Sequence, residues 1–437
     1  MRRRTIISGA GPVSALGIGI EAHWDAMCQG RSGLRTLTAF DASWYPCQIA
    51  GELDREAFKV RSIVPKSYRK AVKVMCRDVE LAVGGAAEAI RHANLQTPGI
   101  DHEEGFPIDP HRLGCHIGAG LIAADVDELT SALAASRGED GEVDLGTWGT
   151  TGMENLTPLW LLKYLPNMLA CHVTIVHDCR GPSNTITCAE SSSALSLGES
   201  MRIIERGSAD ACLTGGAESK LNPLNYYRQY CAGRLADARD LEPLDVVRPF
   251  ASDAIGTAVG EGGGLMVIEA LDHCLERGGT PMAEVLGYAA TQSPDHDGLG
   301  ATAEDLVAAM RNAIRSAGRE PECVDAIVPF GCGIPAIDAA EAEAIRTVFG
   351  DRASEIELVT TVPFTGNCNA GNGTIQIAVA TQCLKTQSLP ARLNAGTVEL
   401  DLKAGPCDAR EADLRTVLVL SASQGGQNTA ILLGRHE

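Results

Sequence analysis

Short apolar runs alternate with longer amphipathic segments along this chain, and the alternation predicts strands and helices in turn. Gly215-Gly216 and the run 260–264 are glycine clusters that predict strand ends. Strands are predicted at Thr5–Ser8, Leu113–Ile117, Val173–Val176, Ala211–Thr214, Gly264–Ile268, Ala283–Gly287, Ala326–Pro329 and Thr416–Ser421. Helices are predicted at Arg69–His92, Ala301–Ala317, Ala339–Val348 and Gly373–Gln382. The pattern alone therefore indicates an α/β fold with a mixed sheet.

One long polar stretch interrupts this pattern. Residues Ser136–Glu154 are rich in Gly, Glu, Asp and Thr, which predicts an exposed surface loop. No low-complexity tail or linker divides the 437 residues, so we expect one compact unit.

Composition and charge narrow the classes of protein. The net charge of −19 argues against a nucleic-acid partner, because phosphate binding needs a basic field. The N-terminus does not resemble a signal peptide and no long apolar run predicts a membrane span, so we expect a cytoplasmic protein. The 15 cysteines show no CxxC pair and no zinc-type spacing, which predicts buried thiols and no metal site.

A basic cluster stands out against the acidic background. Lys66, Arg69, Lys70, Lys73 and Arg77 have helical spacing and would share one side of a helix. Two interpretations remain open: a solvated helix face, or a surface that attracts an acidic partner.

Residues 181–198, GPSNTITCAESSSALSLG, predict a short strand, a sharp turn of small residues and a helix. This segment resembles the nucleophile elbow of the β-ketoacyl-[acyl-carrier-protein] synthases, which has a cysteine nine residues after the first glycine. Here that position is Glu190. Further segments resemble the same family in the same order over nearly the full length: 6–17, 112–120, 206–218, 248–250 and 260–264.

The resemblance implies a thiolase-like fold with five layers, α-β-α-β-α, built from two pseudo-symmetric halves. We place these halves at residues 1–265 and 266–437, with the elbow at 181–198. The resemblance also implies a dimer with the elbow near its interface.

The resemblance further indicates that the family's catalytic groups are replaced together. Residues 325–335 and 341–345 are similar to the NAHGTSTP…ETEAI motif, and 360–367 to STKSMTGH. The loop 421–428 is similar to the family's gating loop, without its two phenylalanines. The positions that match a catalytic histidine, two pantetheine-contacting threonines, a lysine and a second histidine are Phe330, Cys332, Ile334, Val362 and Asn367.

Several roles remain open for Glu190. It can stabilise the start of the following helix, act as a general base with a pKa raised by burial, or support decarboxylation of a malonyl thioester. Asn367 is the best remaining polar residue to orient a carbonyl. We expect packing roles for Cys188, His172 and His177.

Our leading hypothesis is a subunit similar to a chain-length factor, which shapes the acyl or polyketide tunnel of an active ketosynthase in fatty acid or polyketide biosynthesis. The alternatives are an enzyme that uses Glu190 and Asn367 on carrier-protein or coenzyme A thioesters, and a homodimeric acyl-binding protein. The implied partners are acyl carrier protein and an active homologue or a second copy. No cofactor is expected, and a phosphopantetheine-bound acyl chain is the implied ligand. The residues assigned to carrier-protein docking are Lys66, Arg69, Lys70, Lys73, Arg202 and Arg206.

Overall fold

The computed structural model describes residues 2–100, 105–294, 300–398 and 401–436. Its main sheet has the strand order β8-β7-β9-β10-β1-β11-β17-β16-β12-β13. In the first half of the chain these strands are β1 (Thr5–Ser14), β7 (Leu113–Ala119), β8 (Ser183–Ile186), β9 (Ala211–Ser219) and β10 (Glu261–Ala270). In the second half they are β11 (Ala283–Gln292), β12 (Ala326–Val328), β13 (Glu357–Leu358), β16 (Thr416–Ala422) and β17 (Gln427–Gly434).

The two halves of the sheet repeat one topology. In each half we number the five strands by their order in the chain. From the outer edge of the sheet towards its centre, both halves then have the order third, second, fourth, fifth, first. The directions match as well, since two parallel pairs are followed by two antiparallel pairs in both halves. The short antiparallel pairing of Ile6 and Ile7 with Glu284 and Ala283 joins the repeats. The repeat therefore divides between β10 and β11, and the expected boundary at 265/266 lies inside β10.

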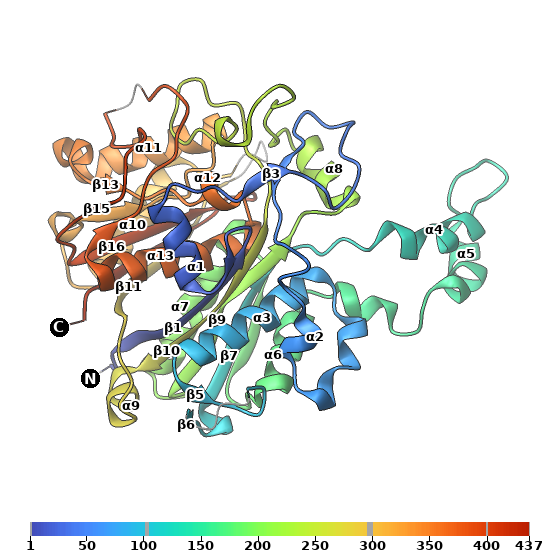
Figure 1. The fold of residues 1–437 in the computed structure, drawn as a ribbon, viewed down its shortest axis with the longest axis horizontal. Coiled ribbons are helices and arrows are strands. Elements are labelled where there is room, and N and C mark those ends of the chain that lie inside the picture. Colours follow the sequence, from blue (N-terminus) through green and yellow to red (C-terminus); the bar gives the residue numbers. More distant parts are fainter. Residues whose placement is uncertain (1, 101–104, 295–299, 399–400, 437) are drawn as a thin grey trace.

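Helices cover both outer faces and fill the space between the halves (Figure 1). Between the sheet halves lie α7 (Ser192–Glu205) and α13 (Asn372–Thr386), and almost every residue of α13 is buried. Helices α3 (Arg77–His92) and α6 (Met168–His177) pack on the outside of the first half, and α10 (Ala303–Ser316) and α11 (Pro335–Phe349) on the outside of the second. These are the five expected layers, so the predicted thiolase-like fold is confirmed.

Close backbone contact fixes how α3 lies on the sheet. A Cβ atom on Gly85 would lie 2.4 Å from the Cα atom of Gly264 in β10. The glycine run at 262–264 is therefore part of a buried strand, with the helix backbone resting on it, and not the strand end that the sequence predicted. Gly215 and Gly216 likewise lie inside β9 and do not end it.

Seven of the predicted strands and the helices at α10, α11 and α13 are confirmed, but two other predictions are wrong. Val173–Val176 belongs to α6 and not to a strand, because a short apolar run of this length fits either structure when it is buried. Residues 66–74 form two 3₁₀ turns, and α3 begins only at Arg77. Ser136–Glu154 is exposed as expected but contains short helical turns from residue 145 onward.

An extended arm leaves the body between β7 and α6 and projects far to the side (Figure 1). It contains α4 (Val126–Ala135) and α5 (Leu145–Thr147). The other helices are α1 (Ile20–Cys28), α2 (Val60–Ile63), α8 (Pro223–Cys231), α9 (Leu271–Glu276) and α12 (Val362–Thr365). Among the described residues, no helix is both long enough and apolar enough to span a bilayer.

Candidate active site

The elbow is a tight turn between β8 and α7. Ala189 has a φ of 44°, a conformation that residues other than glycine rarely adopt. The turn is held by its own polar atoms, since the Cys188 N–H donates to Ser192 Oγ at 2.8 Å and Ser192 Oγ donates to the Ala189 carbonyl at 2.7 Å. The expected strand, turn and helix are therefore present, with Glu190 in the turn.

The second half of the chain contains a matching turn before α13. Asn369 has a φ of 48°, and the Cys368 N–H donates to Asn372 Oδ1 at 2.8 Å. Ser193 of the first turn donates to the carbonyl of Ala370 in the second. The repeat in the sheet thus extends to the two turns, which meet at the centre of the molecule.

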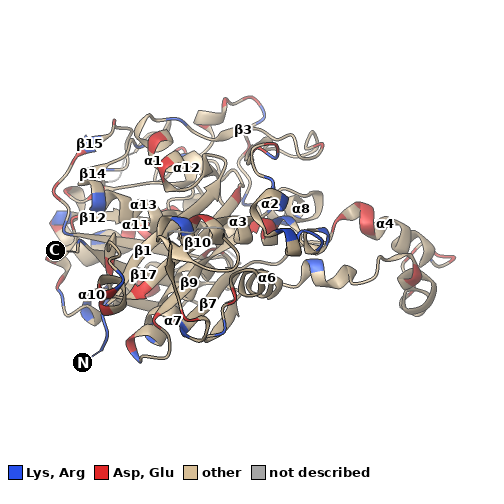
Figure 2. Ribbon diagram, turned by 60° about the horizontal axis from the view of Figure 1, so that its bottom comes forward, with Lys and Arg blue, Asp and Glu red and all other residues tan. Residues whose placement is uncertain are grey.

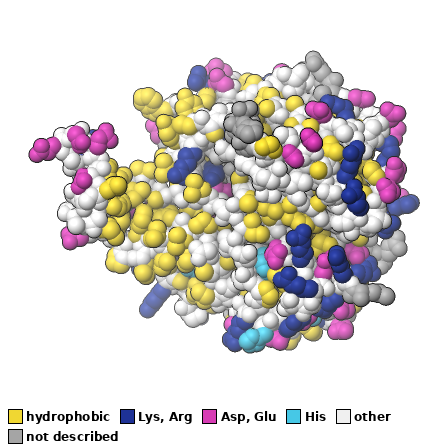
Figure 3. Space-filling view, turned by 180° about the vertical axis from the view of Figure 1, so that it is seen from behind, with side chains coloured by type: hydrophobic (Ala, Val, Ile, Leu, Met, Phe, Trp, Pro, Cys, Tyr) yellow, Lys and Arg dark blue, Asp and Glu magenta, His cyan; other side chains and the backbone are white. Residues whose placement is uncertain are grey.

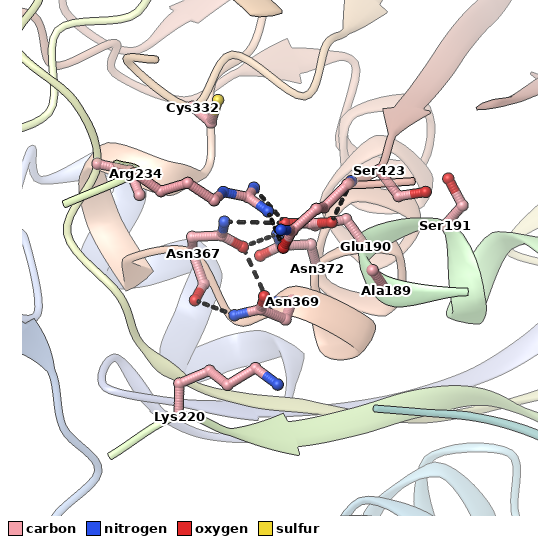
Figure 4. Close-up of polar contacts among 12 residues, drawn as sticks. Ala189, Glu190, Ser191, Lys220, Arg234, Cys332, Asn367, Asn369, Asn372 and Ser423 are labelled. Carbon is pink, nitrogen blue, oxygen red and sulfur yellow. Dashed lines mark hydrogen bonds and ion pairs between the residues drawn. The ribbon is translucent and has the colours of Figure 1, made fainter. Parts of the chain in front are cut away.

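Glu190 lies at the centre of this region and is fully buried (Figure 4). Its Oε1 atom accepts a hydrogen bond from Nη2 of Arg234 at 2.5 Å and one from Nδ2 of Asn367 at 3.2 Å. Its Oε2 atom accepts one from the Gln424 N–H at 3.1 Å. Arg234 Nη1 donates in turn to Gln424 Oε1 at 3.0 Å. The ion pair therefore connects the elbow, the segment after α8 and the loop 423–428.

Electrostatics keep this carboxyl group ionised. Burial alone would raise the pKa of Glu190, but the positive charge of Arg234 and hydrogen bonds from its own backbone, Asn367 and Gln424 outweigh that effect. The net result is a pKa below the ordinary value of 4.5. A general base that works near neutral pH needs the opposite shift.

Most of the hydrogen-bonding capacity of the Asn367 side chain is used within the protein. Beyond its bond to Glu190, its Oδ1 atom accepts from the Asn369 N–H at 2.9 Å and from Asn372 Nδ2 at 2.6 Å. Both acceptor directions are occupied and the side chain is fully buried. In this arrangement Asn367 fixes the second turn instead of orienting a carbonyl.

Phe330 and Val362 are fully packed in the hydrophobic core of the second half. The loop before α11 is held by two buried carboxylates from that helix: Glu341 accepts the N–H groups of Phe330 and Gly331 at 2.8 and 2.9 Å, and Asp338 accepts those of Cys332 and Gly333 at 2.9 and 3.0 Å. Glu341 and Asp338 thus fix the backbone of the loop at residues 330–333. The side chains of that loop present no polar group to a thioester.

The six residues assigned to docking do not form one surface. Lys66, Lys70 and Lys73 are exposed near α2, where Figure 2 shows Lys and Arg gathered. Arg202 and Arg206 lie at the end of α7, beside the start of β9. The two groups are therefore at opposite ends of β9, whose nine residues span about 27 Å at ~3.3 Å per residue.

Two residues of the basic cluster predicted from the sequence, Arg69 and Arg77, are less available than the spacing predicted. Arg77 is half-buried and pairs with Glu261, with nitrogen–oxygen distances of 2.9 Å to both carboxylate oxygens. Arg69 is half-buried. The cluster does not share one helix face, because 3₁₀ turns replace the expected helix here.

The remaining candidate residues are two histidines and a cysteine, and their surroundings favour packing roles. His172 bonds to the Tyr68 hydroxyl and His177 to the Thr97 hydroxyl, both at 2.8 Å, and burial lowers the pKa of His177 to about 3. Burial raises the pKa of the Cys188 thiol, which disfavours the thiolate that a nucleophile needs.

Arg234 and Gln424 are the important residues that sequence reasoning missed. Arg234 lies 44 positions from Glu190 and Gln424 lies 234 positions from it. One signal in the sequence could have indicated a partner for Glu190. An acidic residue was expected at a buried turn, and a buried negative charge requires a cationic partner.

Comparison with known proteins agrees with this architecture. The model of the β-ketoacyl synthase N-terminal domain matches residues 2–273 and that of the C-terminal domain matches residues 282–396. The chain is 30% identical to 3-oxoacyl-[acyl-carrier-protein] synthase 2 of Coxiella burnetii over 438 residues, with 99% of both chains covered. It is 28% identical to the protein of that name from Synechocystis sp., covering 100% of this chain and 99% of the relative.

Solved structures are similar over the same length. The ishigamide ketosynthase/chain length factor superposes with a TM-score of 0.82 at 25% identity, with both chains fully covered. A β-ketoacyl synthase from Burkholderia phymatum gives 0.84 at 22% identity, also over both full chains, and shows the shared fold. Together, the matched domains, the full-length relatives and the repeated α/β topology establish that this chain belongs to the β-ketoacyl synthase family.

Proposed function

We propose that this protein is a catalytically degenerate ketosynthase homologue that acts as a chain-length-factor-like subunit of an active ketosynthase. The supporting observation is the buried ion pair of Glu190 and Arg234, with side-chain exposures of 0% and 4%, in the turn where the family has its nucleophile. Because the pair is desolvated and hydrogen-bonded on both carboxylate oxygens, position 190 has no free nucleophile to accept an acyl chain.

The chemistry of condensation supports this proposal. Claisen condensation on thioesters needs a thiolate, which is both a strong nucleophile and a good leaving group. A carboxylate would form a labile anhydride instead. Decarboxylation needs hydrogen-bond donors directed at the developing enolate. Phe330 supplies no side-chain donor, and the amide of Asn367 is engaged within the protein.

The surroundings of Glu190 favour the structural role over the alternative enzyme. The lowered pKa of Glu190 makes it a weak base at neutral pH. Its negative charge is also unfavourable beside a malonyl carboxylate. The degenerate site thus fits a protein that acts through shape and assembly.

Two surface features support assembly with a partner through the arm side. The outer edge of β8 pairs with no other strand in the described part of the chain, and its residues are exposed or half-buried. Large apolar side chains are exposed on the arm and beside it, as Figure 3 shows: Leu121, Val126, Leu133, Val143, Leu145, Met153, Leu159, Leu161 and Ile175. Contiguous exposed apolar surface of this kind is typical of a protein interface.

We assign the partner as an active homologue with an intact cysteine, and Lys66, Lys70 and Lys73 as the group that would attract an acidic carrier protein. The ishigamide ketosynthase/chain length factor, at 25% identity, supports this choice of partner. We also propose that the halves of the subunit correspond to the two strand repeats.

Co-expression with a ketosynthase homologue that retains its cysteine tests the assembly. A stable one-to-one complex is expected, and a persistent homodimer in the presence of that homologue would contradict the proposal.

Incubation with malonyl-carrier protein, followed by intact mass measurement, tests the chemistry. We expect no acyl adduct and no turnover, with Glu190→Gln as the matched variant. Loss of malonyl carboxylate that depends on Glu190 would favour the alternative enzyme instead, and an adduct on Cys188 would identify a displaced nucleophile.

A further inference from the structure

A cavity of about 430 Å³ opens at the base of the arm, away from the Glu190 ion pair. Its walls come from the start of α3, the end of β9, the loop before β4 (Ile49–Gly51) and both ends of the arm. Phe40 and Met75 provide apolar surface, and Asp125 and Asp127 stand where the arm begins. Its volume is within the range of small-molecule sites, about 300–1,000 Å³.

Asp78 forms part of the cavity wall from a buried position. Only 4% of the residue is exposed. Its Oδ1 atom accepts one long hydrogen bond, 3.3 Å from the Ser219 N–H. Its Oδ2 atom accepts no hydrogen bond from any other residue in the described ranges. Burial and the neighbouring Glu218 raise the pKa of Asp78 to about 7, although Lys220 acts in the opposite direction.

The charges around Asp78 do not balance. Glu218 is paired with Lys220, and Glu261 is paired with Arg77, so these two cations are already used. Asp78 is the third buried carboxylate of this group and has no cation of its own. Five acidic and three basic residues line the cavity, so its surface is also negative overall. A buried carboxylate without a cation is costly unless a proton or a positive ligand neutralises it.

We propose that this cavity is a binding site for a small organic cation, whose ammonium group pairs with Asp78 while its apolar part packs on Phe40 and Met75. The unpaired Oδ2 atom is the acceptor for the ammonium group, and Asp125 and Asp127 attract the cation to the entrance. The site is separate from the elbow, although Val126 belongs both to its wall and to the apolar arm surface assigned to the partner.

Calorimetric titration of the intact protein with phenethylammonium chloride at pH 8 tests this assignment, with 2-phenylethanol as the neutral probe of similar shape. We expect the amine to bind with a Kd below about 1 mM and the alcohol to bind at least tenfold more weakly. Asp78→Asn should weaken binding of the amine by about tenfold or more, because it removes a charge-assisted hydrogen bond. Asp413→Asn, an exposed position in the second half, is the matched control and should not change the affinity.

A second variant protects the test against misfolding of Asp78→Asn. Ala39→Trp leaves Asp78 in place but fills the cavity from a half-buried loop position, and it should abolish binding of the amine. The proposal is overturned if the amine gives no heat at 10 mM, a concentration on the order of ten times the expected Kd. It is also overturned if the alcohol binds equally well, or if a folded Asp78→Asn or Ala39→Trp protein retains the wild-type affinity.

Discussion

Arg234→Met would leave Glu190 buried without its cation, and the structure allows the size of the effect to be worked out. The two side chains are 0% and 4% exposed, so neither can turn into water without displacing the core. Removing one partner of such a pair costs about 3–5 kcal/mol of unfolding free energy, because the other charge stays buried and unpaired. Methionine retains most of the volume of the arginine stem, so little of this cost comes from a cavity.

The double variant separates the ion pair from local packing. Glu190→Gln alone leaves the Arg234 charge unpaired and should also cost several kcal/mol. The combination Glu190→Gln with Arg234→Met removes both charges, and it should be more stable than the sum of the singles predicts, by at least about 2 kcal/mol. Chemical denaturation at one fixed protein concentration measures all four proteins.

The pH dependence gives an independent readout. In the wild type the lowered pKa of Glu190 contributes stability that is present above the ordinary value of 4.5 and is lost as pH falls through the folded value. In Arg234→Met the pKa of Glu190 rises, because burial is then opposed only by the remaining hydrogen bonds and no longer by the positive charge of Arg234. The cost of the substitution should therefore be small at pH 5 and complete at pH 8. Additive singles with a cost independent of pH would refute the reasoning.

Three further predictions follow from other contacts. Gly85→Ala should destabilise the protein by about 1–3 kcal/mol although alanine favours helices, because its Cβ would meet backbone, whereas Gly149→Ala, which meets nothing within 4 Å, should change the melting temperature little. Burial raises the pKa of Glu341 to about 8, above its ordinary value of 4.5. Its contribution to stability is therefore complete below pH 4.5 and is lost as the pH rises to about 8. Thermal melts from pH 5 to 9 should show a smaller fall in melting temperature for Glu341→Gln than for the wild type, and an unchanged slope would contradict this. Leu145 on the arm is 79% exposed, so Leu145→Asp should change the stability of the isolated chain by less than ~0.5 kcal/mol. It should weaken complex formation with the active homologue at least about tenfold. Size-exclusion chromatography measures complex formation, and Leu275→Asp on α9 is the control.

Local patterns predicted those helices and strands whose hydrophobic periodicity matches the side that is buried. The apolar runs at β7, β9 and β16 and the amphipathic α10 follow directly from periodicity. The resemblance, and not the periodicity, provided the five-layer arrangement and the position of Glu190. Where burial is nearly complete, as in α6, the pattern has no polar side and the type of element cannot be predicted from it.

The site could be predicted only in part, because its interactions are not local. The sequence identified the turn and the two polar residues at replaced positions, Glu190 and Asn367, but not what they bind. Their partners come from segments that meet only after the two halves have packed together. The residues assigned to docking lie in two groups at opposite ends of β9, and their order in the sequence does not predict this separation. Their role in carrier-protein docking stays a prediction.

The two matching turns have a consequence for how this chain evolved. Ala189 and Asn369 both have a backbone conformation that L-amino acids rarely adopt, although the side chains of Glu190 and Asn367 at these turns are bonded to other residues of the protein. This geometry is therefore maintained by the start of the helix that follows it, through Ser192 and Asn372. A cysteine restored at position 190 would enter a bend that is already formed. Under the proposed function, a return to covalent chemistry would require new side chains but no new backbone.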